Sequence, residues 1–212
     1  MRKSFTVSLI LFSILISSCS TTPTPTTPQI VSVYSTPAAE PWLSSLYGCA
    51  SPSTVISRVD GSASADIVLR VGEPKVLTSS AFQIDSEDIL IVTHRQSPVQ
   101  NLTLEAARAL FAGYGDSRVQ VWVYSPEEDV QEVFDQFVMA SLSVTSSARI
   151  AATPQQMSDT LVNESNAVGI LPRHWKAGDD REVFKVATVP VLALTNSEPQ
   201  GVIKELIACL QK

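Results

Sequence analysis

The sequence predicts an α/β fold, because helix-like and strand-like patterns alternate at short intervals between Gln100 and Phe137. Apolar residues recur at three- and four-residue spacing through residues 104–112, which is typical of an amphipathic helix. Thr103 suits the N-cap of this helix, since its hydroxyl can accept from the free amides of the first turn. Gly113 suits the C-terminal end of this helix, because glycine adopts positive φ without a steric penalty.

The next two segments continue the alternation. Val119 to Tyr124 is β-branched and aromatic with one strongly polar residue, which indicates an inner strand. A second helix is expected to open at Ser125, with Pro126 at its first position. The carboxylates at 127–129 would then lie in its first turn, where the helix dipole favours negative charge. We interpret them as an ordinary helix start.

The remaining elements follow from the same patterns. Strands are expected at residues 30–34, 54–59, 65–70, 88–94, 168–171, 183–188 and 191–195, and helices at residues 42–47, 155–163 and 201–210.

Three sequence patterns occur in order along the chain: LTLEAARALFAGYG at residues 102–115, AVGILP at residues 167–172 and PVLALTNSEP at residues 190–199. Their order and spacing resemble the phosphate-binding-protein-like members of the type II periplasmic binding proteins. The resemblance covers about residues 29–211. It implies an α/β fold of two lobes, each a mixed sheet flanked by helices, joined by a two-strand hinge.

This resemblance implies that the second lobe is inserted within the first. Lobe one is expected to comprise residues 29–92 and 190–212, and lobe two residues 93–189. The chain would cross between the lobes twice, and the two crossing strands would form the hinge.

The N-terminus has the composition of an export signal. Residues 1–18 carry two basic residues, an apolar run and small residues, which is typical of a signal peptide. The segment Ile16–Cys19 resembles a bacterial lipobox, which implies a lipid on the Cys19 thiol. The alternative is ordinary cleavage near Ser18, with Cys19 an incidental thiol. Residues 20–28 alternate threonine and proline and are expected to be an extended tether after the lipidated cysteine.

Composition excludes one class of partner. The formal net charge of the chain is −6, and no cluster of basic residues occurs. A nucleic-acid-binding protein needs a basic surface to neutralise phosphates, so nucleic acid is not an expected partner.

Four side chains are candidate ligand contacts. Ser35 and Thr36 follow the first predicted strand, where the resembled family contacts its ligand, although either could simply cap the next helix. Ser125 follows the strand at 119–124. Arg173 follows the strand at 168–171, near Trp175, and could line a pocket or lie on a surface loop.

The sequence departs from the family at one of these positions. The family's anion binders place an arginine and a serine-glycine-threonine turn after the strand that corresponds to residues 119–124, and only Ser125 matches. Glu127 and Glu128 would repel an anion bound there. The alternatives are therefore an oxyanion such as phosphate, a neutral or cationic ligand, or no ligand.

Two cysteines remain after Cys19. Cys49 ends the first predicted helix and Cys209 lies in the last one, both in lobe one. In an oxidising compartment they could form a disulfide, and the alternative is two buried free thiols.

We do not expect an enzyme. His94 lies in a predicted strand and His174 in a loop, neither near a cysteine or a metal-ligand spacing, and the sequence has no G-x-S-x-G turn. No metal site and no cofactor are therefore expected.

The resemblance implies two alternative functions. The first is an extracytoplasmic, lipid-anchored solute-binding protein that closes its lobes on a small solute, such as phosphate, for an ABC importer. The second is a ligand-sensing or cell-surface interaction module on the same fold that has lost transport. The expected partners are a small solute and an ABC permease, with the membrane contacted only through the lipid. The chain is expected to be a monomer on the extracytoplasmic face of the cell membrane.

Overall fold

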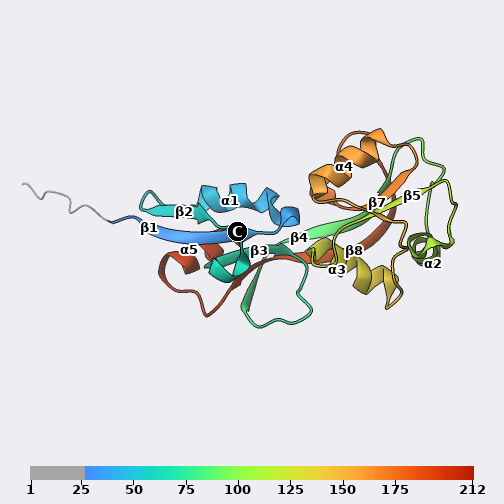
Figure 1. Ribbon diagram of the computed structural model, residues 1–212. Coiled ribbons are helices and arrows are strands. Elements are labelled where there is room, and N and C mark those ends of the chain that lie inside the picture. The colour runs from blue at the N-terminus through green and yellow to red at the C-terminus, as the bar shows by residue number, and fades with distance from the viewer. Residues whose placement is uncertain (1–26) are drawn as a thin grey trace, which may run out of the picture.

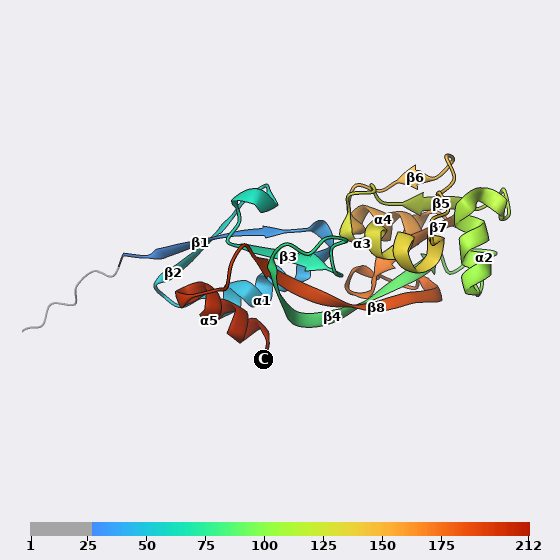
Figure 2. The same cartoon turned by 90° about the horizontal axis from the view of Figure 1, so that it is seen from below.

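A computed structural model describes residues 27–212 and contains an eight-stranded mixed sheet flanked by helices. The strand order is β2-β1-β3-β8-β4-β7-β5-β6. Figures 1 and 2 show that the sheet is divided into two lobes, and that β4 and β8 run from one lobe to the other. The predicted two-lobed α/β architecture is confirmed. The predicted signal peptide and Cys19 lie outside the described residues.

Lobe one contains the first three strands and the two helices nearest the chain ends. β1 lies between β2 and β3 and is parallel to both, and β3 pairs with β8 in the antiparallel sense. The elements of this lobe are β1 (Gln29–Ser35), η1 (Pro37–Ala39), α1 (Pro41–Cys49), β2 (Thr54–Arg58), η2 (Ser62–Ser64), β3 (Ile67–Val71) and α5 (Gly201–Leu210).

Lobe two contains three more parallel strands. β5 lies between β6 and β7, and β7 pairs with β4 in the antiparallel sense. The elements of this lobe are α2 (Leu104–Ala109), η3 (Leu110–Tyr114), β5 (Gln120–Val123), α3 (Asp129–Phe134), η4 (Asp135–Met139), β6 (Arg149–Ile150), α4 (Pro154–Asn163), β7 (Ala167–Pro172) and η5 (Arg173–Trp175).

The two long strands β4 (Ser80–Thr93) and β8 (Arg181–Thr195) pair with each other along most of their length. The sequence predicted a shorter fourth strand and two separate strands in place of β8, and both predictions were wrong. Pro190 lies inside β8. Its carbonyl accepts from Gly72 N–H at 2.7 Å on the side of β3, next to the last pair of β3 and β8, Val71 with Val191. The missing N–H of Pro190 therefore removes no bond to β4.

The helix that opens lobe two begins at Leu104 as predicted, but its α-helical part ends at Ala109 and not at Ala112. The Thr103 hydroxyl accepts from Ala106 N–H at 3.2 Å. α2 continues into the π-helical turn η3, and Gly113 adopts a φ of 90° there. A β-carbon on Gly113 would also lie 2.9 Å from the Thr145 hydroxyl, so both conformation and space favour glycine.

The second helix of lobe two begins later than predicted. Residues 125–128 form a turn closed by a 3.0 Å bond from Glu128 N–H to the Ser125 carbonyl, and α3 begins at Asp129. The delayed start turns Asp129 inward, so that 2% of it is exposed. The predicted start of the helix at Pro126 is therefore wrong, although Asp129 does lie in the first turn as predicted.

Candidate functional site

The carboxyl ends of β1 and β3 point towards lobe two. These strands are parallel and end at Ser35 and Val71. In open α/β sheets the crevice outside the carboxyl ends of parallel strands is where ligands bind. The residues at these two ends, with the segment after β5 that faces them, form the candidate site.

Asp129 lies at the centre of this site. Its Oδ2 accepts from the Thr36 hydroxyl at 2.6 Å and from Val71 N–H at 2.8 Å, and both donors belong to lobe one. Its Oδ1 accepts from Val130 N–H at 2.9 Å. A carboxylate from lobe two is thus bonded to the ends of both β1 and β3.

Two further contacts join the end of β3 to α3 beside the Asp129 carboxylate. Arg70 donates to Glu132 of α3 at 2.9 Å and to the Gly72 carbonyl at 3.0 Å. Gly72 has a φ of 76°, and a β-carbon there would lie 2.7 Å from Val133 Cγ2. α3 therefore packs directly on the end of β3, and no larger residue than glycine fits between them.

The electrostatics of the site oppose a second anion. Burial raises the pKa of Asp129, against the lowering effect of its bonds from Thr36 and Val71. Burial, followed by the charges of Asp129 and Glu127, also raises the pKa of Glu128. The one cation that contacts α3 from β3, Arg70, is already paired with Glu132.

A cavity of about 380 Å³ lies next to this contact, beneath the loop of residues 72–79. Most of its wall comes from lobe one, and Glu127 belongs to lobe two. Its polar lining is mostly uncharged and includes Tyr34, Thr36, Thr78 and Asn196, with Arg70 and Glu127 as its charged groups. This composition suits a small polar solute that forms hydrogen bonds.

The serines predicted to contact a ligand have local partners. Ser35 is 4% exposed, and its hydroxyl donates to the Thr36 carbonyl at 3.0 Å. The Ser125 hydroxyl donates to the Glu127 carboxylate. Of the four predicted ligand contacts, Thr36 is the one that lines the cavity.

Arg173 lies at the hinge. Its guanidinium pairs with Asp88 of β4 at 3.1 Å and with Glu182 of β8 at 3.2 Å. Asp88 also accepts from Lys185 and Thr188, and these bonds hold the pKa of its carboxyl at about 2. Arg173 therefore joins the two hinge strands to η5, and its role as a ligand contact stays a prediction.

A second group of contacts between the lobes lies at η5. The indole N–H of Trp175 donates to the Ala38 carbonyl of lobe one at 3.1 Å. The neighbouring His174 ring lies 4.6 Å from the ring of Trp42 in α1, and its Nδ1 bonds to Glu87 of β4. The lobes are thus joined by their own side chains at two places.

Sequence reasoning missed the residues that make these contacts. From the sequence alone, Asp129 is interpreted as part of an acidic helix start and Arg70 as an ordinary strand residue. The local sequence carries no signal for either role, because the partners of Asp129 lie 58 and 93 residues away.

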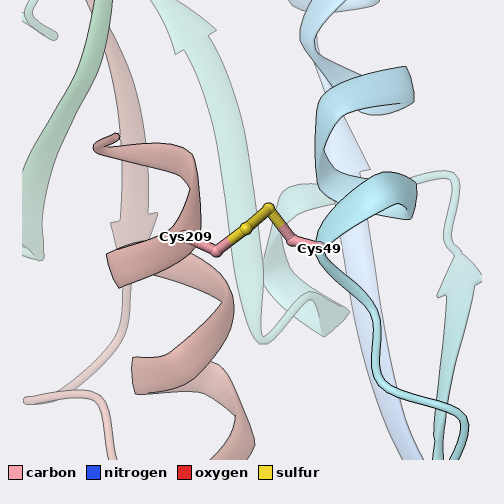
Figure 3. Close-up of a disulfide and its surroundings, with 2 residues drawn as sticks. All are labelled: Cys49 and Cys209. Atoms are coloured by element: carbon pink, nitrogen blue, oxygen red, sulfur yellow. A yellow bond between two sulfur atoms is a disulfide. The ribbon is translucent and has the colours of Figure 1, made fainter.

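Figure 3 shows a disulfide between Cys49 at the end of α1 and Cys209 in α5, with their Cα atoms 5.9 Å apart. It ties together two helices of lobe one that lie at opposite ends of the folded chain. Within residues 27–212, the structure places no three His, Cys, Asp or Glu residues together in a way that could hold a metal ion. The same residues include no helix long and apolar enough to cross a membrane.

The fold is of the type II periplasmic-binding-protein-like kind, with two lobes. No family model and no curated protein matches the chain. The fold is nevertheless shared with several solved structures, all of which have low sequence identity to this chain.

A protein from Clostridium perfringens assigned as a phosphate ABC transporter substrate-binding protein, solved with bound phosphate, has a TM-score of 0.73 and 16% identity, over 86% of this chain and 93% of that one. An ABC-type phosphate transport receptor from Vibrio cholerae has a TM-score of 0.66 and 17% identity, over 86% and 93%. The regulatory domain of CcmR from Synechocystis PCC6803, in complex with 2-PG, has a TM-score of 0.66 and 8% identity, over 86% and 96%. The fold is therefore found in both solute-binding and regulatory proteins.

Proposed function

We propose that this chain is an extracytoplasmic, lipid-anchored solute-binding protein of the kind that serves ABC importers. The observation that carries the proposal is the polar cavity at the carboxyl ends of β1 and β3, in a two-lobed fold that phosphate transport receptors share. The N-terminal sequence supports the proposal, because it resembles a signal peptide with a lipobox at Ile16–Cys19. The chain would bind and release its solute without chemistry.

The lining of the cavity favours a neutral or cationic polar solute over an oxyanion. Its hydroxyl and amide groups can donate and accept, whereas Glu127 and the neighbouring Glu128 and Asp129 add negative charge on the lobe-two side. An oxyanion would meet repulsion there, and Arg70 is already neutralised by Glu132.

A thermal-shift screen of the mature chain against sugars, amino acids, polyamines, phosphate, sulfate and molybdate tests this function. A solute at a hundred times its dissociation constant adds about 2.7 kcal/mol to the free energy of unfolding. Asn196→Leu should weaken the shift because it replaces an amide of the cavity wall with an apolar side chain, whereas Asn101→Leu, at an exposed position outside the cavity, should keep it. Absence of any shift across the panel would count against solute binding.

The membrane anchor needs a separate test. In a bacterial host, the full-length chain should partition with membranes, and its N-terminal peptide should carry the mass of a diacylglycerol on Cys19. Cys19→Ser should lose this mass. A wild-type chain recovered without lipid and cleaved near Ser18 would contradict the anchor.

A second function, a sensor or cell-surface interaction module, is supported by the contacts between the lobes. Asp129, Glu132 and Trp175 bond to lobe one through the protein's own groups, so closure does not require a solute. Solution scattering distinguishes the two functions. A solute that binds and reduces the radius of gyration favours transport, and binding with no change in shape favours the second function.

A further inference from the structure

Two lobe-one groups and one lobe-two group donate to the same carboxylate. The Thr36 hydroxyl and Val71 N–H lie at the ends of two parallel strands, and both reach Asp129 Oδ2, at 2.6 and 2.8 Å. Val130 N–H, at 2.9 Å, reaches Oδ1. A hydroxyl and two amides that converge on two oxygens form a set of donors that suits a small oxyanion.

Burial shows that this carboxylate is more than a surface helix cap. Asp129 is 2% exposed. The bond to Val130 is a local one between neighbouring residues, whereas the partners Thr36 and Val71 belong to the other lobe. A buried carboxylate is stable only when donors compensate its lost hydration, and here most of that compensation comes from lobe one.

Negative charge predominates near Asp129. Arg70 is the nearby cation that favours its ionised form, while Glu132 pairs with Arg70, and Glu128 lies next to Asp129 in sequence. An additional anion would enter a region that already contains three carboxylates and one guanidinium. The donors are therefore occupied, and the surrounding charge resists a competitor.

We propose that Asp129 is a built-in ligand: its carboxylate fills an oxyanion site at the carboxyl ends of β1 and β3 and thereby holds the two lobes together. Removal of the carboxylate exposes a latent site for a small carboxylate or other oxyanion. This inference bears on the choice between the two proposed functions, because lobes that Asp129 already holds together favour the second function over closure on a solute. The two sites also share Thr36, which donates to Asp129 and lines the cavity beneath residues 72–79.

Chemical rescue tests the latent site. Asp129→Ala should unfold at a lower temperature than the wild type, and sodium formate should raise its midpoint by several degrees relative to sodium chloride at equal ionic strength. The rescue should saturate with formate concentration, since formate supplies the missing carboxylate. The wild type should respond equally to the two salts because its site is filled.

The matched control is Glu128→Ala, which removes a carboxylate from the adjacent position but leaves the three donors occupied. It should show no difference between formate and chloride. Formate rescue of Glu128→Ala as large as that of Asp129→Ala would indicate a non-specific salt effect and overturn the proposal. The same conclusion follows if Asp129→Ala folds and formate leaves its midpoint unchanged.

Two further measurements keep the proposal open to refutation if Asp129→Ala fails to fold. Asp129→Asn fills the same space with a neutral group and should fold with a lower midpoint and no response to formate. Solution scattering from the wild type without added solute should match the described structure, with both lobes in contact. A wild-type profile of separated lobes that contracts upon addition of phosphate would show that the site takes an external ligand, and would overturn the proposal.

Discussion

The Arg70 guanidinium of lobe one lies 2.9 Å from the Glu132 carboxylate of lobe two, so an ion pair crosses between the lobes three residues along α3 from Asp129. The two side chains are 14% and 21% exposed. Partial burial reduces screening by solvent, which makes this pair stronger than a typical surface pair.

We predict a coupling energy of about 1 kcal/mol between Arg70 and Glu132. A double-mutant cycle with Arg70→Met and Glu132→Gln, followed by urea unfolding, measures it. The exposed pair Arg95–Asp179, whose side chains are 60% and 77% exposed, is the control and should show a coupling energy near zero. Equal coupling in the two cycles would mean that the pair between the lobes has no special role.

The second prediction concerns the contact of Gly72 with α3. Gly72→Ala should lower the free energy of unfolding by about 2 kcal/mol or more, because the new methyl group would lie 2.7 Å from Val133 Cγ2 and the φ of 76° disfavours alanine. Adding Val133→Ala should recover part of the loss relative to the sum of the two single changes, since it relieves the clash but not the backbone strain. Chemical denaturation measures all three variants.

Gly48→Ala is the control for this series. Gly48 lies in α1, and a β-carbon there would meet nothing within 4 Å. Because alanine favours a helix over glycine by about 1 kcal/mol, this change should leave stability unaltered or raise it. A Gly72→Ala variant as stable as Gly48→Ala would contradict the close packing of the lobes.

The third prediction concerns acid stability at the hinge. Lys185, Thr188 and Arg173 hold the pKa of Asp88 at about 2, below its usual value of 3.8. A carboxyl with a lowered folded-state pKa stabilises the protein above its unfolded-state pKa, and this stabilisation is lost as the pH falls from about 4 to about 2. Asp88→Asn should therefore lower stability at pH 6, and the difference from the wild type should shrink towards pH 2.

Thermal unfolding between pH 2 and pH 7 measures this dependence. Asp60→Asn, at an exposed position in lobe one, is the control and should follow the wild-type curve. A constant difference between Asp88→Asn and the wild type at every pH would assign the effect to packing and not to the charge of Asp88.

The fourth prediction concerns the disulfide. The bond between Cys49 and Cys209 closes a loop with a sequence separation of 160 residues. In the chain-entropy account such a loop is worth about 5 kcal/mol of stability. Cys49→Ser/Cys209→Ser should lower the unfolding midpoint accordingly, and a thiol reductant should lower that of the wild type but not that of the double variant. A reductant effect of equal size on both would point to something other than this bond.

Local signals in the sequence determined several elements without help from the structure. α2 begins after Thr103 as its cap indicates, Gly113 interrupts the π-helical turn that follows α2, and α5 spans Gly201–Leu210 as its apolar spacing predicts. Caps, glycine stops and apolar periodicity act between residues a few positions apart, so the sequence alone carries them. The two-lobed fold was predicted from the family resemblance of the segments at residues 102–115, 167–172 and 190–199, and not from these local signals.

Tertiary structure decided the elements and residues whose partners lie far away in the chain. β4 extends back to Ser80 because β8 pairs with its polar half, where the only alternation of apolar and polar residues is the short one at residues 82–85. Asp129 looks like an exposed carboxylate in its own neighbourhood. It becomes a buried link between the lobes because Thr36 and Val71, 93 and 58 residues away, supply the hydrogen bonds that replace its hydration.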